Sequence, residues 1–125
     1  MEKIHLEFPL NSNSRAMIWE SIGTTGGLEA WMADRITEKD GIYTFSWGGG
    51  ETRQAVLLAK RIGTYVRFHW TDEGPKTFFE LRIAFSELTN TFILVVTEQT
   101  DDDDTDGLIQ LWESFADKLS RRAGV

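Results

Sequence analysis

The chain of 125 residues combines 41% hydrophobic with 26% charged residues, a composition that predicts one globular domain over residues 1–125 with its own core. It contains no cysteine, which excludes disulfides, thiol nucleophiles and thiolate metal sites. A formal net charge of −7 is unfavourable for contact with a phosphate backbone, so we expect no nucleic-acid partner.

The sequence pattern does not predict an export signal or a membrane span. Charges at Glu2, Lys3 and Glu7 interrupt the apolar residues of the N-terminal segment, whereas a signal peptide has a continuous apolar core. No apolar run approaches the roughly 18 residues that a membrane-spanning helix needs. We therefore expect a cytoplasmic protein.

The N-terminal part of the chain predicts a strand followed by two short helices. Apolar and polar residues alternate over residues 4–8, as in a half-buried strand, and Pro9 ends the run. Apolar residues then recur with helical spacing over residues 16–22, and this helix ends at Gly23. The second helix carries apolar residues between positions 28 and 32. We expect these helices to form a bent pair.

From residue 34 the hydrophobic pattern has a period of two, which indicates strands. Turn-forming sequences separate the alternating runs, among them Gly48–Gly50 and the acidic segment Asp72–Pro75. The short turns predict an antiparallel meander. Its predicted strands cover residues 42–47, 52–62, 65–71, 79–85 and 91–97.

The C-terminal segment predicts an amphipathic helix. Its apolar residues recur at helical spacing and form one wide stripe, which requires a partner surface: Leu108, Leu111, Trp112, Phe115 and Leu119. Because the preceding strands provide such a surface, the order of elements predicts an α+β fold in which a curved antiparallel sheet grips a long C-terminal helix.

This arrangement resembles the START-like, or helix-grip, superfamily (SRPBCC, Bet v 1-like). Within it, the chain is most similar to the branch related to the activator of the ninety-kilodalton heat-shock chaperone's ATPase. The similarity covers essentially the whole chain. It is carried by the order of four segments, namely residues 18–22 with Trp31 twelve positions after Trp19, residues 41–47, residues 62–70, and residues 91–97 ahead of the final helix.

The resemblance implies about seven strands, in the order strand, two helices, six strands and a long helix, with an apolar cavity between sheet and helix. We map the cavity wall, and hence the predicted ligand-binding residues, onto Trp31, Phe45, Trp47, Phe68, Trp70, Phe79, Leu81, Ile83, Trp112 and Phe115. The implied function is non-enzymatic binding of a small apolar or amphipathic ligand, such as a lipid, without a cofactor. The same alternation is also what a filled core requires, so the aromatic rings either enclose a slot or fill the space.

Two other functions remain open. One is a co-chaperone-like protein-interaction module, whose acidic surface would meet a basic partner. The other, ranked last, is an enzyme of the cyclase or dehydratase type. Both a monomer and a homodimer are compatible with the sequence.

No catalytic residue is assigned. His5 and His69 each lie between inward-facing apolar neighbours, so both side chains are expected to point away from the core. Near the expected cavity mouth, Glu29, Asp34 and Arg35 either orient a polar ligand group or, as we prefer, form solvated ion pairs.

Residues 102–113 match the letters of the calcium loop D-x-D-x-D-G-x5-E, with Asp102, Asp104, Asp106 and Glu113 at the acidic positions. The segment before this loop predicts a strand, whereas a calcium loop of this type is normally entered from a helix. We therefore interpret the aspartates as groups that cap the amide end of the last helix, and assign no metal site.

Overall fold

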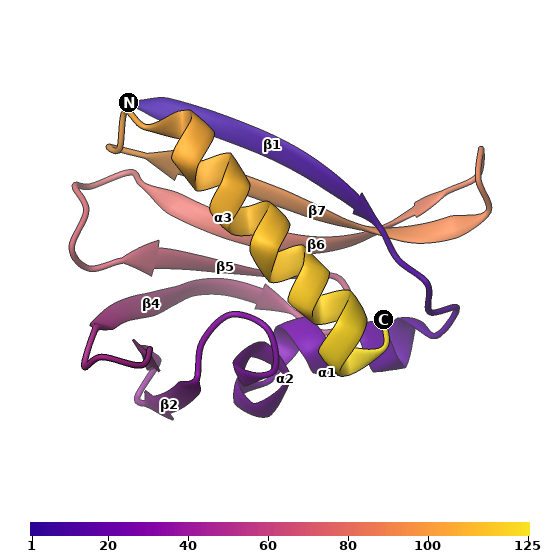
Figure 1. The fold of residues 1–125 in the computed structure, drawn as a ribbon, viewed down its shortest axis with the longest axis horizontal. Coiled ribbons are helices and arrows are strands. Elements are labelled where there is room, and N and C mark those ends of the chain that lie inside the picture. Colours follow the sequence, from indigo (N-terminus) through magenta and orange to yellow (C-terminus); the bar gives the residue numbers. More distant parts are fainter.

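The computed structural model describes residues 1–125 and has the predicted α+β architecture. Seven strands form one antiparallel sheet in the order β1-β7-β6-β5-β4-β3-β2, which curves around the long helix α3 (Figure 1). The strands are β1 (Glu2–Pro9), β2 (Arg35–Lys39), β3 (Ile42–Ser46), β4 (Thr52–Arg61), β5 (Tyr65–Trp70), β6 (Phe78–Ser86) and β7 (Thr91–Thr100). The helices are α1 (Arg15–Gly23), α2 (Thr25–Glu29), α3 (Thr105–Lys118) and the π-helical turn η1 (Leu119–Ala123).

The strands predicted from the alternating runs begin at residue 42 and omit β2, although the family resemblance implies the matching strand count. In β2 only Ile36 is buried, so the segment carries almost no alternating signal. A second difference concerns β7, which continues to Thr100 instead of ending at residue 97. Its last inward-facing residues are Glu98 and Thr100. Because both are polar, the alternation of apolar and polar residues stops before the strand does.

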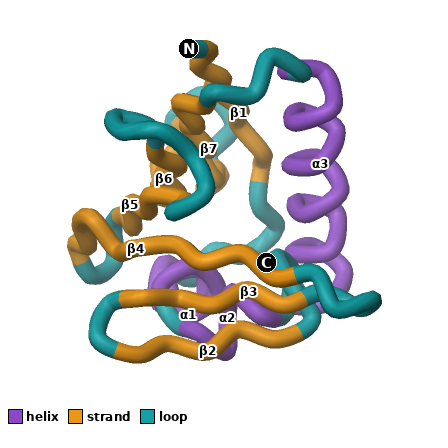
Figure 2. Tube along the Cα trace, turned by 90° about the vertical axis from the view of Figure 1, so that its left-hand side faces the viewer, coloured by secondary structure: helices purple, strands orange, loops and turns teal.

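The two short helices close one end of the curved sheet (Figure 2). The Ser14 hydroxyl accepts a hydrogen bond from the Met17 amide and caps α1, and the Thr24 hydroxyl does the same for α2 through the Gly27 amide. Gly27 lies directly against the backbone of α1, where a larger residue would not fit. The pair is further joined by Trp31, whose indole donates to the Ser21 carbonyl at 2.8 Å.

Helix α3 lies across the concave face of the sheet. It begins at Thr105, with the Asp104 side chain accepting a hydrogen bond from the Gly107 amide. The amphipathic stripe predicted from the sequence turns Trp112 and Phe115 toward the sheet, where both are buried. After η1, the Val125 oxygen accepts from the Asn11 amide at 2.7 Å, which ties the end of the chain to the connection between β1 and α1.

A continuous cluster of aromatic rings occupies most of the space between the sheet and α3. Phe68 and Phe79 stack with their ring centroids 5.1 Å apart, and Trp70 lies 4.9 Å from Phe79. The cluster continues to Trp112, 5.8 Å from Phe79, and so joins the sheet to the helix. At these separations ring pairs are in van der Waals contact, and this part of the core is filled.

Candidate functional site

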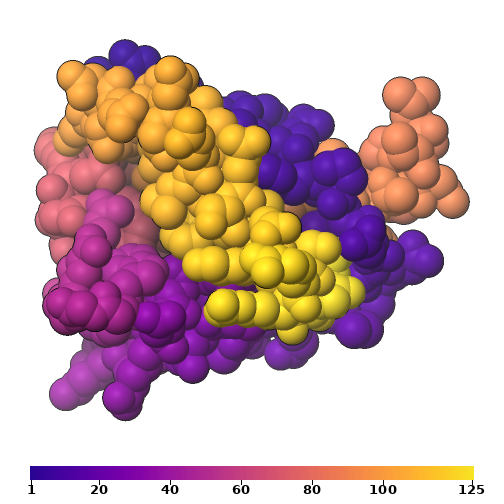
Figure 3. Space-filling view, viewed as in Figure 1, coloured from indigo at the N-terminus to yellow at the C-terminus, as the bar shows by residue number.

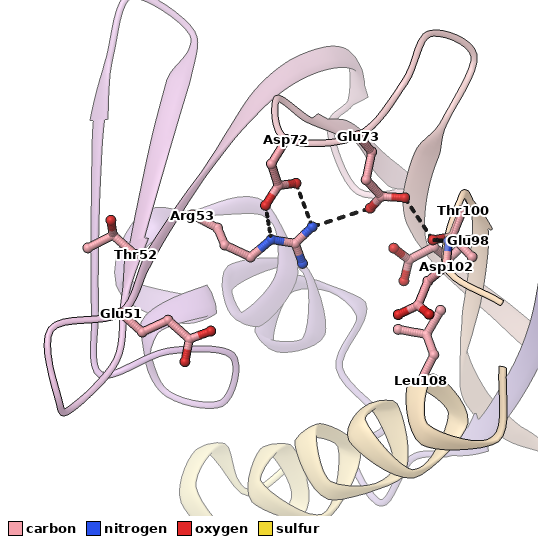
Figure 4. A pocket seen from close by; sticks show the side chains of 9 residues that line it. All are labelled: Glu51, Thr52, Arg53, Asp72, Glu73, Glu98, Thr100, Asp102 and Leu108. Atoms are coloured by element: carbon pink, nitrogen blue, oxygen red, sulfur yellow. Dashed lines mark hydrogen bonds and ion pairs between the residues drawn. The ribbon is translucent and has the colours of Figure 1, made fainter. Parts of the chain in front are cut away.

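Two adjoining hollows lie between α3 and the neighbouring ends of β3, β4 and β5. A depression is visible there between α3 and the segment around residues 50–75 (Figure 3). The first, which we call the apolar hollow, has a volume of about 230 Å³ and is lined by Met32, Trp47, Glu51, Arg53, Trp70, Leu111 and Phe115. The second, the acidic mouth, has a volume of about 470 Å³ and is lined by Glu51, Thr52, Arg53, Asp72, Glu73, Glu98, Thr100, Asp102 and Leu108 (Figure 4). The two share Glu51 and Arg53, and we refer to them together as the groove.

Arg53 stands at the junction of the two hollows. It lies two residues before the buried Ala55 on β4, so its side chain points to the concave face. Its guanidinium lies 3.9 Å from the centre of the Trp70 ring and donates to both carboxylate oxygens of Asp72, each at 2.8 Å. A third bond reaches Glu73 at 3.2 Å. The hydrogen bond from Arg53 lowers the pKa of Asp72, so the two side chains form a bidentate ion pair.

The acidic segment between β5 and β6 forms one wall of the mouth. Glu73 accepts hydrogen bonds from the Thr100 hydroxyl at 2.7 Å and from the Asp101 amide at 3.0 Å. The Asp101 carboxylate in turn accepts from the Gly74 amide at 2.7 Å. These bonds join the turn to the end of β7, so side chains distant in the sequence face one another across the mouth (Figure 4).

Glu98 is the most deeply buried charged side chain of the groove, with 3% of its surface exposed. It lies between Ile4 of β1 and Phe79 of β6 in the sheet register, and the Trp112 indole donates to its Oε1 atom at 2.8 Å. Burial raises the pKa of Glu98 to about 7, against the opposing effect of the Trp112 hydrogen bond. The negative charge of Glu73 raises the pKa further, while Arg53 lowers it. This carboxyl therefore titrates close to neutral pH.

The structure divides the predicted ligand-binding residues between the groove and the core. Trp47, Trp70 and Phe115 line the apolar hollow. Trp112 lines a narrow inner space of about 20 Å³ that adjoins it. The remaining predicted residues are buried in the hydrophobic core and line neither hollow, namely Trp31, Phe45, Phe68, Phe79, Leu81 and Ile83.

The predicted site residues did not include Arg53, Glu73 or Glu98, which lie at the centre of the groove. Glu98 continues the inward-facing series of Leu94 and Val96 on β7, and Arg53 precedes Ala55 by two positions on β4. Alternation, extended past residue 97, is the signal that would have found Glu98. The contact between Arg53 and Glu73 cannot be predicted from alternation, because the two residues lie in separate segments of the chain.

The two histidines and the polar residues expected near the cavity mouth lie outside the groove lining. His5 is exposed, and His69 Nδ1 lies 3.0 Å from the Thr77 carbonyl oxygen on the outward side of β5. Glu29 accepts a hydrogen bond from the Ile36 amide, and Asp34 accepts one from the Gly48 amide. The latter two carboxylates therefore hold the connections around β2 and β3. The exposed Arg35 lies on the edge strand β2.

The acidic segment before α3 has the geometry of a helix cap. The Asp102 carboxylate accepts from the Asp104 amide at 2.9 Å, and Asp104 caps Gly107. Because α3 already begins at Thr105, the later positions of the calcium-loop pattern, including Glu113, are helical. No group of three histidine, aspartate or glutamate side chains is arranged to hold a metal ion.

Comparison with known proteins identifies the family. The sequence model of the START-like superfamily domain matches residues 1–125. This chain belongs to the START-like superfamily. The resemblance and the helix-grip fold expected from the sequence are thereby confirmed. The fold of this superfamily often binds ligands or mediates interactions. None of the helices in this START-like protein has the length and apolarity needed to cross a membrane.

Solved structures of similar proteins span nearly the full START-like chain. The protein BfR322 from Bacteroides fragilis is 41% identical, with 96% of this chain and 89% of that protein covered and a TM-score of 0.63. The Aha1 dimer from Colwellia psychrerythraea is 17% identical, with 98% and 94% covered and a TM-score of 0.76. XoxI from Bacillus cereus is 11% identical, with 97% and 94% covered and a TM-score of 0.81. Among proteins of curated function, none matches this chain.

Proposed function

We propose that this START-like protein binds a small amphipathic molecule in the groove, with the apolar part of the ligand in the apolar hollow and its polar end toward the acidic mouth. The observation that carries this proposal is the direct junction of an apolar space with a polar one at Arg53. Ligand sites typically combine an apolar lining with a few polar groups that fix orientation. The groove has this combination.

The walls of the apolar hollow favour binding of an apolar group. Trp47, Trp70 and Phe115 offer large, rigid surfaces, and burial of apolar area contributes about 25 cal/mol per Å² removed from water. The volume of about 230 Å³ limits the ligand to a short chain or a small ring system. The filled core beneath Trp70 also limits the size of the ligand, because a large lipid would have to displace packed rings there.

Leu111 offers the test of this proposal, because it lines the hollow while 45% of its surface is exposed. A tryptophan at this position can occupy the hollow without overpacking the core, which would be the result of enlarging the fully buried Leu81. We expect Leu111→Trp to abolish binding of the neutral fluorophore N-phenyl-1-naphthylamine and to change the free energy of unfolding by less than about 1 kcal/mol.

The matched control is Leu88→Trp, in the turn between β6 and β7, where Leu88 is 96% exposed. This variant adds the same side chain far from the groove and should bind the fluorophore as the wild type does. Equal affinity of the folded Leu111→Trp variant and the control would refute a ligand site in the apolar hollow.

A protein-interaction role is the second candidate, and the acidity of the mouth favours it. Glu51 and Asp102 are exposed at its rim, in a chain whose formal net charge is −7, so the matching partner is a basic protein surface. Such binding should weaken with added salt and with Glu51→Gln or Asp102→Asn, whereas Leu111→Trp should leave it unchanged. Isothermal titration with a basic partner recovered from the host would separate the two functions.

A further inference from the structure

The inner end of the groove contains a buried carboxylate that faces a very small space. Glu98 lines both the acidic mouth and the inner space of about 20 Å³. Trp112 donates to Oε1 of Glu98 at 2.8 Å, and the Trp70 indole also lowers the pKa of this carboxyl. No fully buried side-chain oxygen of the protein lacks a partner, so the second oxygen of Glu98 is open to the groove. Only 3% of the surface of Glu98 is exposed, so its charge has little contact with water and is costly to maintain. A positively charged donor in the inner space would remove that cost.

The surroundings of the inner space suit a small cation. Trp112 and Phe115 line it together with Glu98, and their rings attract a positive charge in addition to the attraction of the carboxylate. Trp70 and Arg53 also line it, and the Arg53 guanidinium lies 3.9 Å from the centre of the Trp70 ring. A space of about 10–15 Å³ or more holds one water-sized group, so the inner space of about 20 Å³ can hold a primary ammonium group, whose N–H groups can donate hydrogen bonds to a carboxylate.

The charges of the groove lining also favour a cationic ligand. The lining of the acidic mouth includes one guanidinium, that of Arg53, and five carboxylates, those of Glu51, Asp72, Glu73, Glu98 and Asp102. The charge of Arg53 is already compensated by the bidentate bond to Asp72 and the bond to Glu73. An anionic head group would therefore meet net repulsion, whereas a cationic one would meet net attraction.

We infer that the ligand of the groove is a primary amine with a short apolar chain, that its ammonium group occupies the inner space against Glu98, and that its chain lies in the apolar hollow. The inference rests on the proposed function and specifies the chemical class of the ligand. Glu98 is then the residue that determines specificity for the head group.

The experiment compares four ligands with the same chain, namely octylamine, octan-1-ol, octanoate and octyltrimethylammonium. At pH 8 the amine is protonated and Glu98 is mostly ionised. Each ligand is titrated into the ¹⁵N-labelled protein, and the indole N–H signals of Trp47, Trp70 and Trp112 report binding in the groove. The indole signal of Trp19, on α1, is the internal control.

We expect octylamine to bind about ten-fold more tightly than octan-1-ol, as a hydrogen bond to a charged group implies, and octanoate to bind least. Octyltrimethylammonium should also bind about ten-fold more weakly than octylamine, because its head has no N–H group to donate to Glu98. In Glu98→Gln the preference for the amine over the alcohol should fall to within about three-fold, while Glu87→Gln, which removes the same charge in the distant turn between β6 and β7, should retain it.

Each contrary outcome has a distinct meaning. Equal binding of the amine and the alcohol in the wild type overturns the inference and leaves the proposed function standing. Equal binding of the two ammonium ligands overturns the placement of the head group in the inner space. If none of the four ligands shifts the groove indoles, the proposed function fails, and the inference fails with it.

Discussion

Replacement of Glu98 by glutamine should make the protein more stable at alkaline pH and leave it unchanged at acid pH. In the folded protein the pKa of Glu98 is raised to about 7, mainly by burial, from an ordinary value of 4.5. At about 1.36 kcal/mol per pKa unit, this difference in pKa between the folded and unfolded states corresponds to about 3 kcal/mol in the free energy of unfolding. Between pH 4.5 and 7 the folded state holds a proton that the unfolded state has released, so the free energy of unfolding of the wild type falls as pH rises through this window.

Glutamine does not titrate and keeps a carbonyl oxygen that can accept the Trp112 hydrogen bond, so the variant lacks this loss. Urea denaturation followed by tryptophan fluorescence at pH 4.5 and pH 8 measures the effect. We expect equal stabilities at pH 4.5, and at pH 8 a variant more stable than the wild type by up to about 3 kcal/mol. Glu87→Gln is the control for removal of a charge. A difference independent of pH, or a variant less stable at pH 8, would refute the assignment of a raised pKa to Glu98.

Two further predictions concern positions outside the groove. Arg82 and Arg67 hydrogen-bond to Glu80 and hold its pKa below the ordinary value against the effect of burial, so Glu80 stabilises the fold above about pH 4.5 and this contribution is lost as pH falls. Glu80→Gln should therefore cost about 1 kcal/mol in urea denaturation at pH 7 and less at pH 3; an equal cost at both values would contradict the ionic role. Gly27→Ala should lower the melting temperature strongly, because the added Cβ overlaps the backbone of α1, whereas Gly26→Ala, with open space around it, should not. Equal melting temperatures of the two variants would show that the two helices are not held in this close contact.

The sequence alone determined which side chains face the helix. Successive side chains of a strand point to opposite faces, so the alternation over residues 65–71 is sufficient to identify Phe68 and Trp70 as inward-facing. The helical spacing of Trp112 and Phe115 identifies the matching face of α3 in the same way. Local periodicity is sufficient here, because it depends only on the geometry of one element.

Only the tertiary structure decided where open space remains. The sequence assigned Phe79 and Trp47 to the same cavity wall, but Phe79 is packed between other rings, whereas Trp47 borders the apolar hollow. Whether rings fill a volume or enclose it depends on how side chains from different strands meet. The pairing of Arg53 with Asp72 and Glu73, and the burial of Glu98 beneath α3, likewise depend on contacts between segments distant in the sequence. The pattern within one strand contains no information about such contacts, and the chemistry of the groove depends on them.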